Sequence, residues 1–331
     1  MKIVVTGGAG FIGSHFIKYL LKEYPDYKVL NIDKLTYAGN LENLKEVEKN
    51  PNYKFLKVDI CNRDMEDVVD GYDVIINFAA ESHVDRSIQE PEAFLKTDIM
   101  GTFNLLEISR KKGIHRYIQI STDEVYGSAD EGYPFSEESP LNPSSPYSAS
   151  KASADLLVLS YYKTYKTPGI IIRSTNNYGP NQYPEKFIPL FITNAIEDKP
   201  LPLYGDGKNI RDWLFVRDNC RAIDIILHKG KTGIIYNVAA EQERENIFIA
   251  RKILEYLGKP ESLIKFVPDR PGHDRRYSIS CERIKELGWE PEVPFEEGLR
   301  ITIEWYKNNE MWWKKIKSGE FLEYYRRQYK L

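Results

Sequence analysis

Two side chains one helical turn apart, Tyr147 and Lys151, are the first candidates for chemistry in this sequence. They stand four residues apart in the string YSASK, so a helix would place them on one face. A lysine cation beside a phenol favours the phenolate and lowers the pKa of the tyrosine from about 10. Such a tyrosine can remove the proton of an alcohol while a cofactor accepts the hydride. The same spacing also arises by chance on helix surfaces, so the pair indicates alcohol oxidation only beside a cofactor site.

A second polar cluster follows the apolar run at 117–120. The string STDEVYG (121–127) brings Thr122, Asp123 and Glu124 together where a buried strand should end. Neighbours on an extended backbone point to different sides, so the two carboxyl groups could serve different atoms of a substrate. Asp123 could act as an acid near neutral pH only if burial or a nearby negative charge kept it protonated. Taken alone, Ser121 and Glu124 also fit a helix capping box, which is the simpler interpretation of the string.

A glycine pattern near the N-terminus predicts a dinucleotide-binding loop. Gly7, Gly10 and Gly13 follow an apolar run and lead into a helical pattern. Such glycines permit a tight turn, a close approach to a pyrophosphate and close helix–strand packing, while the free N–H groups of the helix face the phosphates. Asp33, 20 residues past Gly13, would bond the ribose hydroxyls and repel a 2′-phosphate. The pattern therefore favours NAD over NADP.

The elements that must position these residues alternate between strands and helices. Strands are expected at 2–7, 28–33, 53–59, 73–80, 116–122 and 168–175, and helices at 11–24, 91–113 and 146–165. Apolar strands that alternate with helices predict βαβ units, and right-handed crossovers make these a doubly wound parallel sheet of the Rossmann type. Asp59 and Ile60 end the third strand. They could contact an adenine or form a simple turn, and the sequence does not decide between these two interpretations.

The sequence changes character after residue 178, where we place a domain boundary. Residues 1–178 are expected to form an NAD-binding domain, and residues 179–331 a smaller α/β domain that binds substrate. The second part should contain a strand at 233–240, a helix at 245–259 and mostly helix from 296 onward. Strands from 210–240 are expected to return to the main sheet, so the division is not clean.

Composition excludes several classes of function. Charged residues make up 29% of the chain, and the formal net charge is −3, so neither nucleic acid nor a membrane surface is expected as a partner. The sequence has no apolar stretch of about 20 residues and no signal-peptide pattern. Cys61, Cys220 and Cys281 are too scattered for a disulfide framework or a zinc site, which indicates a cytoplasmic protein. His83 and Asp85 lack a sensibly spaced third ligand, so no metal is expected.

Eight strings carry a resemblance to a known family. They are TGGAGFIGSH, NIDKLTYAGN, AAESHVDRSI, STDEVYG, YSASK, NNYGPNQYPEKFIPL, YGDGKNIRDWLFV and DRPGHDRRY, in order from residue 2 to about 280. Together they resemble the dTDP-glucose 4,6-dehydratases, extended short-chain dehydrogenases/reductases that act on nucleotide sugars. The resemblance implies a hydro-lyase: NAD oxidises C4 of dTDP-glucose, water leaves across C5 and C6, and the hydride returns to C6. The implied product is dTDP-4-keto-6-deoxy-glucose, and NAD is regenerated at each turnover.

The resemblance also implies a role for each member of the two polar clusters. Tyr147 would be the base of C4 oxidation, Thr122 would bond the C4 oxygen, and Lys151 would bond the nicotinamide ribose. Glu124 would remove the C5 proton, and Asp123 would protonate the leaving C6 hydroxyl. Cofactor contacts are implied at Gly7, Gly10, Phe11, Ile12, Gly13, Asp33, Lys34, Thr36, Asp59, Ile60, Ala79, Ala80, Ser82, Thr97, Tyr147, Lys151 and Asn177.

Contacts with the nucleotide sugar are implied mainly in the second part of the chain. They fall at Ser82, Thr122, Asn176, Lys186, Pro202, Tyr204, Arg211, Asn246, Asp269, Arg270 and His273. Lys186 and Arg211 are cations suited to a diphosphate, which Arg211 could grip in bidentate fashion. Asn246 opens an expected helix, so its backbone N–H could add to that grip. Pro202 and Tyr204 offer a flat apolar surface on which a pyrimidine could stack. Each of these residues could also have an ordinary packing role.

Two other functions stay open. A nucleotide-sugar 4-epimerase would share the glycine loop, Asp33, Tyr147 and Lys151, but it would not need two acids after Thr122. A non-catalytic dinucleotide-sensing protein predicts the loss of Tyr147 or Lys151, and both are present. The sequence does not decide between thymidine and uridine. The family is usually a homodimer with a four-helix interface, which helices at 91–113 and 146–165 would suit.

Overall fold

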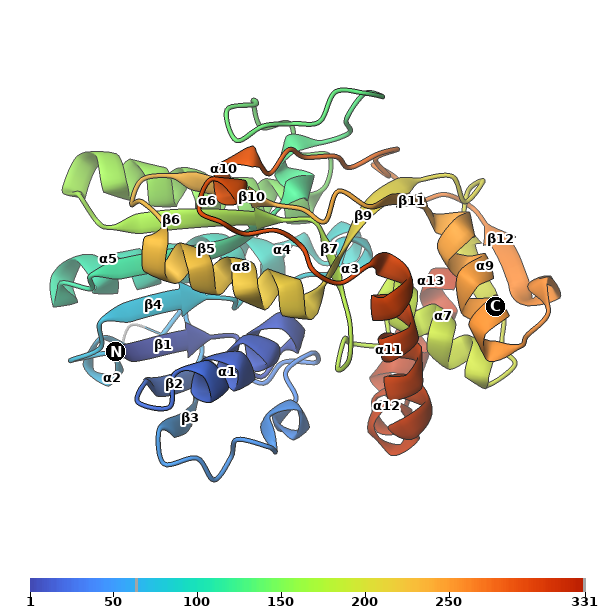
Figure 1. Cartoon of the computed structure of the whole chain (residues 1–331), viewed down its shortest axis with the longest axis horizontal. Coiled ribbons are helices and arrows are strands. Elements are labelled where there is room, and N and C mark those ends of the chain that lie inside the picture. The colour runs from blue at the N-terminus through green and yellow to red at the C-terminus, as the bar shows by residue number, and fades with distance from the viewer. Residues whose placement is uncertain (63–64, 330–331) are drawn as a thin grey trace.

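A seven-stranded parallel sheet forms the larger part of the molecule (Figure 1). The structure is a computed structural model that describes residues 1–62 and 65–329. The strands of this sheet are β1 (Lys2–Thr6), β2 (Lys28–Asp33), β3 (Tyr53–Lys57), β4 (Val74–Asn77), β5 (Arg116–Thr122), β6 (Gly169–Ser174) and β10 (Ile235–Val238). Their order is β10-β6-β5-β4-β1-β2-β3. The order runs outward in both directions from β1, which confirms the predicted doubly wound sheet.

Helices cover both faces of this sheet because its strands are apolar on both sides. In β1, Ile3, Val4 and Val5 are all fully buried. Ile3 and Val5 belong to the core under α1 (Phe11–Glu23) and α8 (Val216–Lys229). Val4 belongs to the opposite core, under α5 (Thr102–Lys112) and α6 (Pro146–Tyr165). The carboxyl ends of the strands are thereby left open between the two layers, where a ligand can bind.

The helix expected over 91–113 is interrupted. The chain forms α4 (Pro91–Phe94), then a π-helical segment (Leu95–Gly101), and only then α5, which ends at Gly113. A π-segment widens the helix locally and shifts the direction of the side chains that follow, and such segments occur often at functional sites. The helix expected over 146–165 is present as α6, which Ser145 caps by accepting the Ser148 N–H.

The second part of the chain builds a smaller α/β unit around its own core. One three-stranded sheet contains β7 (Asn176–Tyr178), β9 (Ile210–Phe215) and β11 (Glu243–Glu245), and β8 (Leu201–Tyr204) pairs with β12 (Ile264–Val267). The main helices here are α7 (Phe187–Ile196), α9 (Asn246–Leu257), α11 (Phe295–Asn308), α12 (Glu310–Ile316) and α13 (Glu320–Tyr329). The C-terminal segment is helical as predicted, and its residues 330 and 331 lie outside the described residues.

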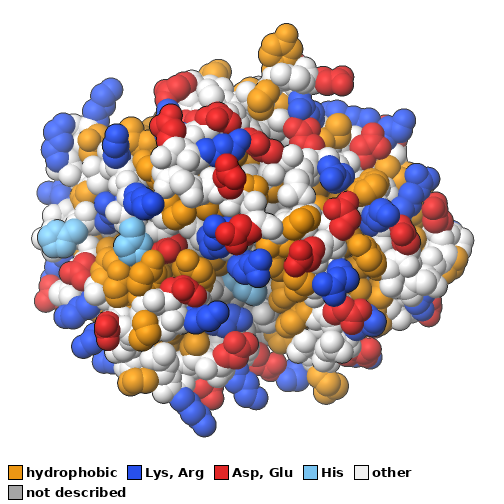
Figure 2. Space-filling view, in the orientation of Figure 1, with side chains coloured by type: hydrophobic (Ala, Val, Ile, Leu, Met, Phe, Trp, Pro, Cys, Tyr) orange, Lys and Arg blue, Asp and Glu red, His pale blue; other side chains and the backbone are white. Residues whose placement is uncertain are grey.

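Short elements complete the described chain. They are η1 (Leu41–Leu44), α2 (Met65–Val68), α3 (Val84–Gln89), η3 (Asp123–Tyr126), η4 (Glu261–Leu263) and α10 (Glu282–Lys285). Among the residues described, no helix is long and apolar enough to cross a membrane. Basic and acidic side chains are intermixed over the face shown in Figure 2.

The chain passes between the two parts of the molecule more than once. Of the apolar runs between 210 and 240, β10 lies in the main sheet, whereas β9 lies in the smaller three-stranded sheet. Cys281, Ile284 and Trp289 also pack in the core of the main sheet. The boundary near residue 178 remains a prediction.

Candidate active site

The glycine loop after β1 forms a cradle that side chains would fill. Gly7 has φ +69°, and a Cβ there would lie 2.5 Å from the Ala79 nitrogen. A Cβ on Gly13 would lie 2.6 Å from the Gly7 oxygen, so the helix can approach the strand this closely only with glycine. Gly10 is the N-cap of α1, and no described side chain caps the helix there. The free N–H groups of α1 can therefore face a pyrophosphate.

Asp33 ends β2 beside this cradle. Its carboxylate accepts hydrogen bonds from the N–H of Ala9 at 2.9 Å and of Leu35 at 2.7 Å, which hold the glycine loop and the next loop together. Burial raises the pKa of Asp33, and these two bonds oppose the rise. Each carboxylate oxygen has a second lone pair for a ribose hydroxyl. Asp59 forms a turn through the Cys61 N–H and also pairs with Lys34 at 2.7 Å.

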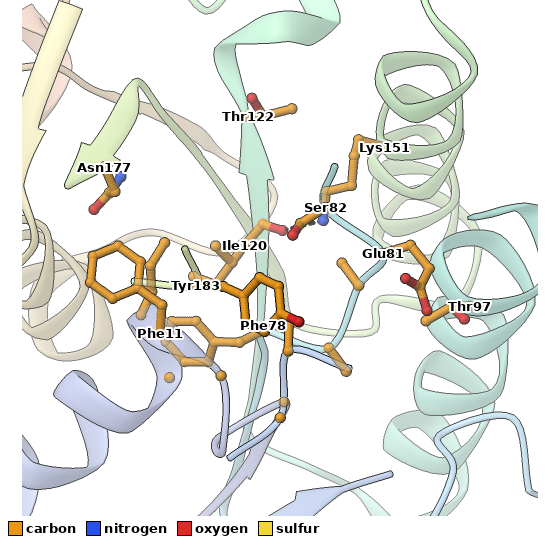
Figure 3. A pocket seen from close by; sticks show the side chains of 18 of the residues that line it. Phe11, Phe78, Glu81, Ser82, Thr97, Ile120, Thr122, Lys151, Asn177 and Tyr183 are labelled. Atoms are coloured by element: carbon orange, nitrogen blue, oxygen red, sulfur yellow. Dashed lines mark hydrogen bonds between the residues drawn. The ribbon is translucent and has the colours of Figure 1, made fainter. Parts of the chain in front are cut away.

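A cavity of about 290 Å³ lies against the cradle, Asp33 and Asp59. Every residue predicted to contact the cofactor lines it. Figure 3 shows Thr122, Lys151 and Ser82 reaching it from β5, α6 and the loop after β4. The sequence analysis missed further lining residues, which include Ala38, Gly39, Val58, Phe78, Gln182 and Tyr183. Val58 and Phe78 directly follow strands β3 and β4, so the rule that ligands bind at the carboxyl ends of parallel strands could have found them. The glycine cradle, the uncapped helix and the acid at the end of β2 fit NAD.

Tyr147, which is half-buried, and Lys151, which is buried, lie on α6 beside this cavity. The Lys151 Nζ donates to the Ile120 oxygen at 2.7 Å. Burial and the negative charges of Glu124 and Asp98 raise the pKa of Tyr147 well above its ordinary value. The prediction of a lowered pKa for Tyr147 is wrong in this structure, because the desolvation of the phenol dominates.

Asp123 and Glu124 begin the short 3₁₀ helix η3 rather than extending β5. The expectation that they lie on extended backbone is therefore wrong. Successive residues of a 3₁₀ helix are about 120° apart, so the two carboxyl groups still point in different directions. The cap is Thr122, whose side chain accepts the Glu124 N–H at 3.2 Å, so the alternative of a capping box at Ser121 does not describe this turn.

The surroundings of Asp123 and Glu124 affect the pKa values of the two carboxyl groups differently. Burial and the negative charge of Glu124 raise the pKa of Asp123 to about 8, so this carboxyl group carries a proton at neutral pH. Its Oδ2 atom is buried and has no hydrogen-bond partner among the described residues. Burial also raises the pKa of Glu124, but the positive charges of Arg270, Arg211 and Lys186 oppose the rise. Two carboxyl groups whose neighbouring charges differ in sign are suited to separate acid and base roles.

A second cavity, of about 150 Å³, adjoins the first. Both cavities are lined by Ser82, Glu124, Asn176 and Lys186, so Glu124 lies where the two meet, whereas Asp123 lines the first alone. Most of the predicted substrate contacts line the second cavity, namely Ser82, Asn176, Lys186, Pro202, Tyr204, Arg211, Asn246, Arg270 and His273. Thr122 lines the first cavity instead.

Two predicted substrate contacts are placed differently from expectation. Asp269 does not line either cavity; its carboxylate accepts the Arg270 N–H at 2.9 Å and contacts His273 Nδ1 at 2.5 Å, so it orders the loop. The Asn246 N–H donates to the Asn209 oxygen at 3.0 Å and is not free for a phosphate. The side-chain Oδ1 of Asn246, by contrast, is buried without a partner within the described part of the chain.

Three buried or half-buried cations face the second cavity. Arg211 stacks on Tyr277 at 4.0 Å, and its two Nη atoms donate to the backbone oxygens of Ile210 and Asp274. Arg270 pairs with Asp85 at 3.1 Å, and Lys186 donates to the Ser82 oxygen. Sequence reasoning missed Asp85, Tyr277 and Tyr329 as parts of this site, because only tertiary contacts bring them there.

This fold and site define an NAD-dependent enzyme of the extended short-chain dehydrogenase/reductase class. The family model described as GDP-mannose 4,6 dehydratase matches residues 4–302. A dTDP-glucose 4,6-dehydratase of Streptomyces niveus is 47% identical over 97% of both chains. The chain belongs to this 4,6-dehydratase family and is similar to its dTDP-glucose members.

Two solved structures extend the comparison. The dTDP-glucose 4,6-dehydratase of Bacillus anthracis in complex with NAD is 51% identical, with a TM-score of 0.90 over 96% of this chain and 100% of that chain. The Streptomyces venezuelae enzyme with NAD and TYD bound is 46% identical, with a TM-score of 0.94 over the same shares.

Proposed function

We propose that this protein dehydrates dTDP-glucose to dTDP-4-keto-6-deoxy-glucose, with NAD as its cofactor. It is a hydro-lyase, as are the relatives that share 46 to 51% of its residues over nearly the whole chain. The observation that supports the reaction type is the Asp123–Glu124 pair, which lines the first cavity, with Glu124 lining the second as well. The protonated Asp123 beside a cation-supported Glu124 supplies the acid and the base that an elimination of water requires.

The residues divide the reaction among them. The glycine loop, Asp33 and Lys151 of the first cavity would hold NAD, which would supply the hydride chemistry at C4 and C6. Tyr147 takes the proton of the C4 hydroxyl, and for this role the Lys151 cation and the positive charge of a bound nicotinamide must offset the burial that raises its pKa. Thr122 lies beside it to bond the C4 oxygen. Glu124 removes the C5 proton, which the neighbouring ketone makes acidic, and Asp123 protonates the leaving C6 hydroxyl. Lys186, Arg211 and Arg270 surround the end of the site suited to the diphosphate.

The mass of the product tests this proposal against a 4-epimerase. Incubation with dTDP-glucose should give a product lighter by one water, whereas an isomer of unchanged mass would show epimerisation. UDP-glucose in a parallel reaction tests the preference for thymidine, and equal turnover of both substrates would contradict it.

We also infer that the chain works as a homodimer in the cytoplasm. Large apolar side chains are exposed on neighbouring helices: Leu95, Met100 and Phe103 around α4 and α5, and Leu156 and Tyr165 on α6. Such a face suits a four-helix interface with a second copy. Leu156→Arg should halve the mass measured by light scattering, while Arg251→Glu, at an exposed position of α9 in the smaller unit, should leave it unchanged. Free thiols at Cys61, Cys220 and Cys281 suit a reducing compartment.

A further inference from the structure

A line of hydrogen-bonding side chains leads from Glu124 away from the two cavities. The Tyr277 hydroxyl lies 3.3 Å from Glu124 Oε2 and 2.9 Å from Asp274 Oδ2, so its single proton can be donated to either carboxylate. The Ser144 hydroxyl donates to the same oxygen of Asp274. Glu124, Tyr277, Asp274 and Ser144 therefore form a continuous chain of polar atoms, which we call the Tyr277 path.

The Tyr277 path runs from the interior of the molecule to its surface. Tyr277 is 3% exposed and Asp274 is 9% exposed, whereas Ser144 is an exposed residue. The loop that carries Asp274 can approach Ser144 closely because residue 272 is a glycine. Its φ is +62°, and a Cβ there would lie 2.6 Å from the backbone oxygen of Ser144. The outer end of the path can therefore exchange protons with water, while its inner end is at the candidate base.

Tyr277 is held in one place and keeps its proton. The Arg211 guanidinium stacks over its ring at 4.0 Å, which fixes the ring between the two carboxyl groups. Burial and the negative charge of Glu124 raise the pKa of Tyr277 well above its ordinary value, so the side chain stays a phenol. A phenol that does not ionise can pass a proton on only while it receives another. The carboxyl groups on either side of it are suited to give and to accept that proton.

Bound ligands would close the direct route from Glu124 to water. Glu124 lines both cavities, so a dinucleotide in the first and a nucleotide sugar in the second would cover its carboxyl group. A proton that Glu124 removes from C5 could then return to C5 or leave through the protein. Tyr277 provides the second of these routes.

We propose that the Tyr277 path carries the C5 proton between Glu124 and solvent, with Tyr277 as its relay. The electron pair of the broken C5–H bond forms the C5–C6 double bond as the hydroxyl leaves C6. Protonated Glu124 then donates to the Tyr277 oxygen while the Tyr277 proton passes to Asp274, so the negative charge moves from Asp274 to Glu124. Asp274 exchanges its proton with water beside Ser144, and the reverse steps bring a solvent proton to C5. The inference rests on the proposed function for the role of Glu124.

Turnover of dTDP-glucose in deuterium oxide tests the path by the isotope found at C5 of the product. The product is reduced at once with borohydride, so that the ketone does not exchange its neighbouring hydrogens in solution, and C5 is observed by NMR. The unchanged protein should place deuterium at C5. Tyr277→Phe keeps the ring on which Arg211 stacks but cannot relay a proton, so the substrate hydrogen should remain at C5. Tyr133→Phe, at an exposed tyrosine that lines neither cavity, is the matched control and should give the deuterium content of the unchanged protein.

Asp274→Asn tests the next link of the path. The amide oxygen still accepts a hydrogen bond but does not hold a transferred proton, so deuterium at C5 should be lost in this variant too. Asp274→Asn also decides the question if Tyr277→Phe does not fold. A side chain that only orients Glu124 would lower kcat on substitution without changing the deuterium content, and that result in either variant would overturn the proposal.

The path and the function fail separately. Normal dehydration with a deuterium content unaffected by Tyr277→Phe would refute the path and leave the function standing. Hydrogen rather than deuterium at C5 in the product of the unchanged protein would also refute the path, because the same proton would then return. Absence of any product lighter by one water would overturn the function, and the path with it.

Discussion

The two cavities of this active site are built in different ways. The first is made by backbone at the carboxyl ends of parallel strands, where Gly7, Gly10 and Gly13 leave room and α1 presents its free N–H groups. The second is made by side chains that meet across long stretches of sequence. Asp85 accepts a hydrogen bond from Arg270, which is 185 residues away in the sequence, and Glu124 accepts one from Tyr277, which is 153 residues away. The dinucleotide site therefore depends on backbone shape, whereas the sugar-nucleotide site depends on distant side chains.

The two cavities also differ in charge. Acids outnumber lysines in the lining of the first, which includes Asp33, Asp59, Glu81, Asp123 and Glu124 beside Lys34, Lys151 and Lys186. Lys186, Arg211 and Arg270 face the second, which suits a diphosphate. Glu124 lines both, so the positive charges of Arg270, Arg211 and Lys186 act on a carboxyl group that also faces the first cavity. A substitution in one cavity should therefore affect the binding of one ligand only. A substitution where the cavities meet should affect both.

The largest effect is expected from Glu124→Gln, which removes the base where the cavities meet. Oxidation at C4 should still occur, but the C5 proton would stay, so NADH should accumulate and kcat should fall about 10³-fold. The measurement is the absorbance of NADH in a single turnover. Glu138→Gln, at an exposed glutamate, should behave like the unchanged protein. Full turnover by Glu124→Gln would refute the assignment of the base.

Asp123→Asn is expected to reduce kcat about 10²-fold, because the amide cannot give its proton to the leaving hydroxyl. The acid form of Asp123 is the active one, so kcat of the unchanged protein should fall as the pH rises through about 8. The variant has no group to titrate there and should lack this fall. A pH profile of kcat for both proteins checks the prediction, and an identical fall in the variant would contradict it.

Arg211→Lys separates the second cavity from the first. A lysine keeps the charge but cannot make the bonds of a planar guanidinium to Ile210 and Asp274, so KM for dTDP-glucose should rise about ten-fold. NAD affinity should be unchanged. Arg275→Lys, in the exposed pair with Asp206, is the control and should leave KM unchanged. A parallel loss of NAD affinity in Arg211→Lys would show that the two cavities are not independent.

Asp33→Asn should have the smallest effect, and it should fall on the first cavity alone. Loss of a charged acceptor for the ribose hydroxyls should weaken NAD about five-fold, consistent with about 1 kcal/mol for a hydrogen bond. The preference for NAD over NADP should narrow, because the charge that repels a 2′-phosphate is gone. Titration of both cofactors measures this, with dTDP binding as the internal control. An unchanged ratio of the two affinities would count against the role of Asp33.

The cofactor half was predictable from the sequence because its determinants are local. The glycine spacing, the acid 20 residues past Gly13 and the alternation of strands with helices depend on neighbours along the chain. All of the cofactor contacts predicted from them, and from the family resemblance, line one cavity. The break of the helix after residue 94 was not predictable, since a π-segment carries no composition signal in the sequence.

The substrate half was predictable only where a motif of the family could be carried over. Asp269, assigned to the substrate by resemblance, orders its own loop, and the N–H of Asn246 is taken by Asn209. Asp85 lies in one of the family strings and was considered only as a metal ligand, and Tyr329 lies outside those strings, because the partners of both are more than 100 residues away. Side-chain contacts over such separations follow from packing rather than from spacing.

The sequence by itself determined the sheet, the glycine loop, the residue types of the catalytic clusters and the family. Those features follow from local backbone preferences and from the alternation of apolar residues. Only the tertiary structure decided the protonation of Asp123 and the high pKa of Tyr147, because burial and charges from distant segments set the electrostatic cost of ionising each group. Only the tertiary structure places α13 beside the second cavity. The helix and the other elements of that cavity are far apart in the sequence, and they meet because their apolar faces pack in one core.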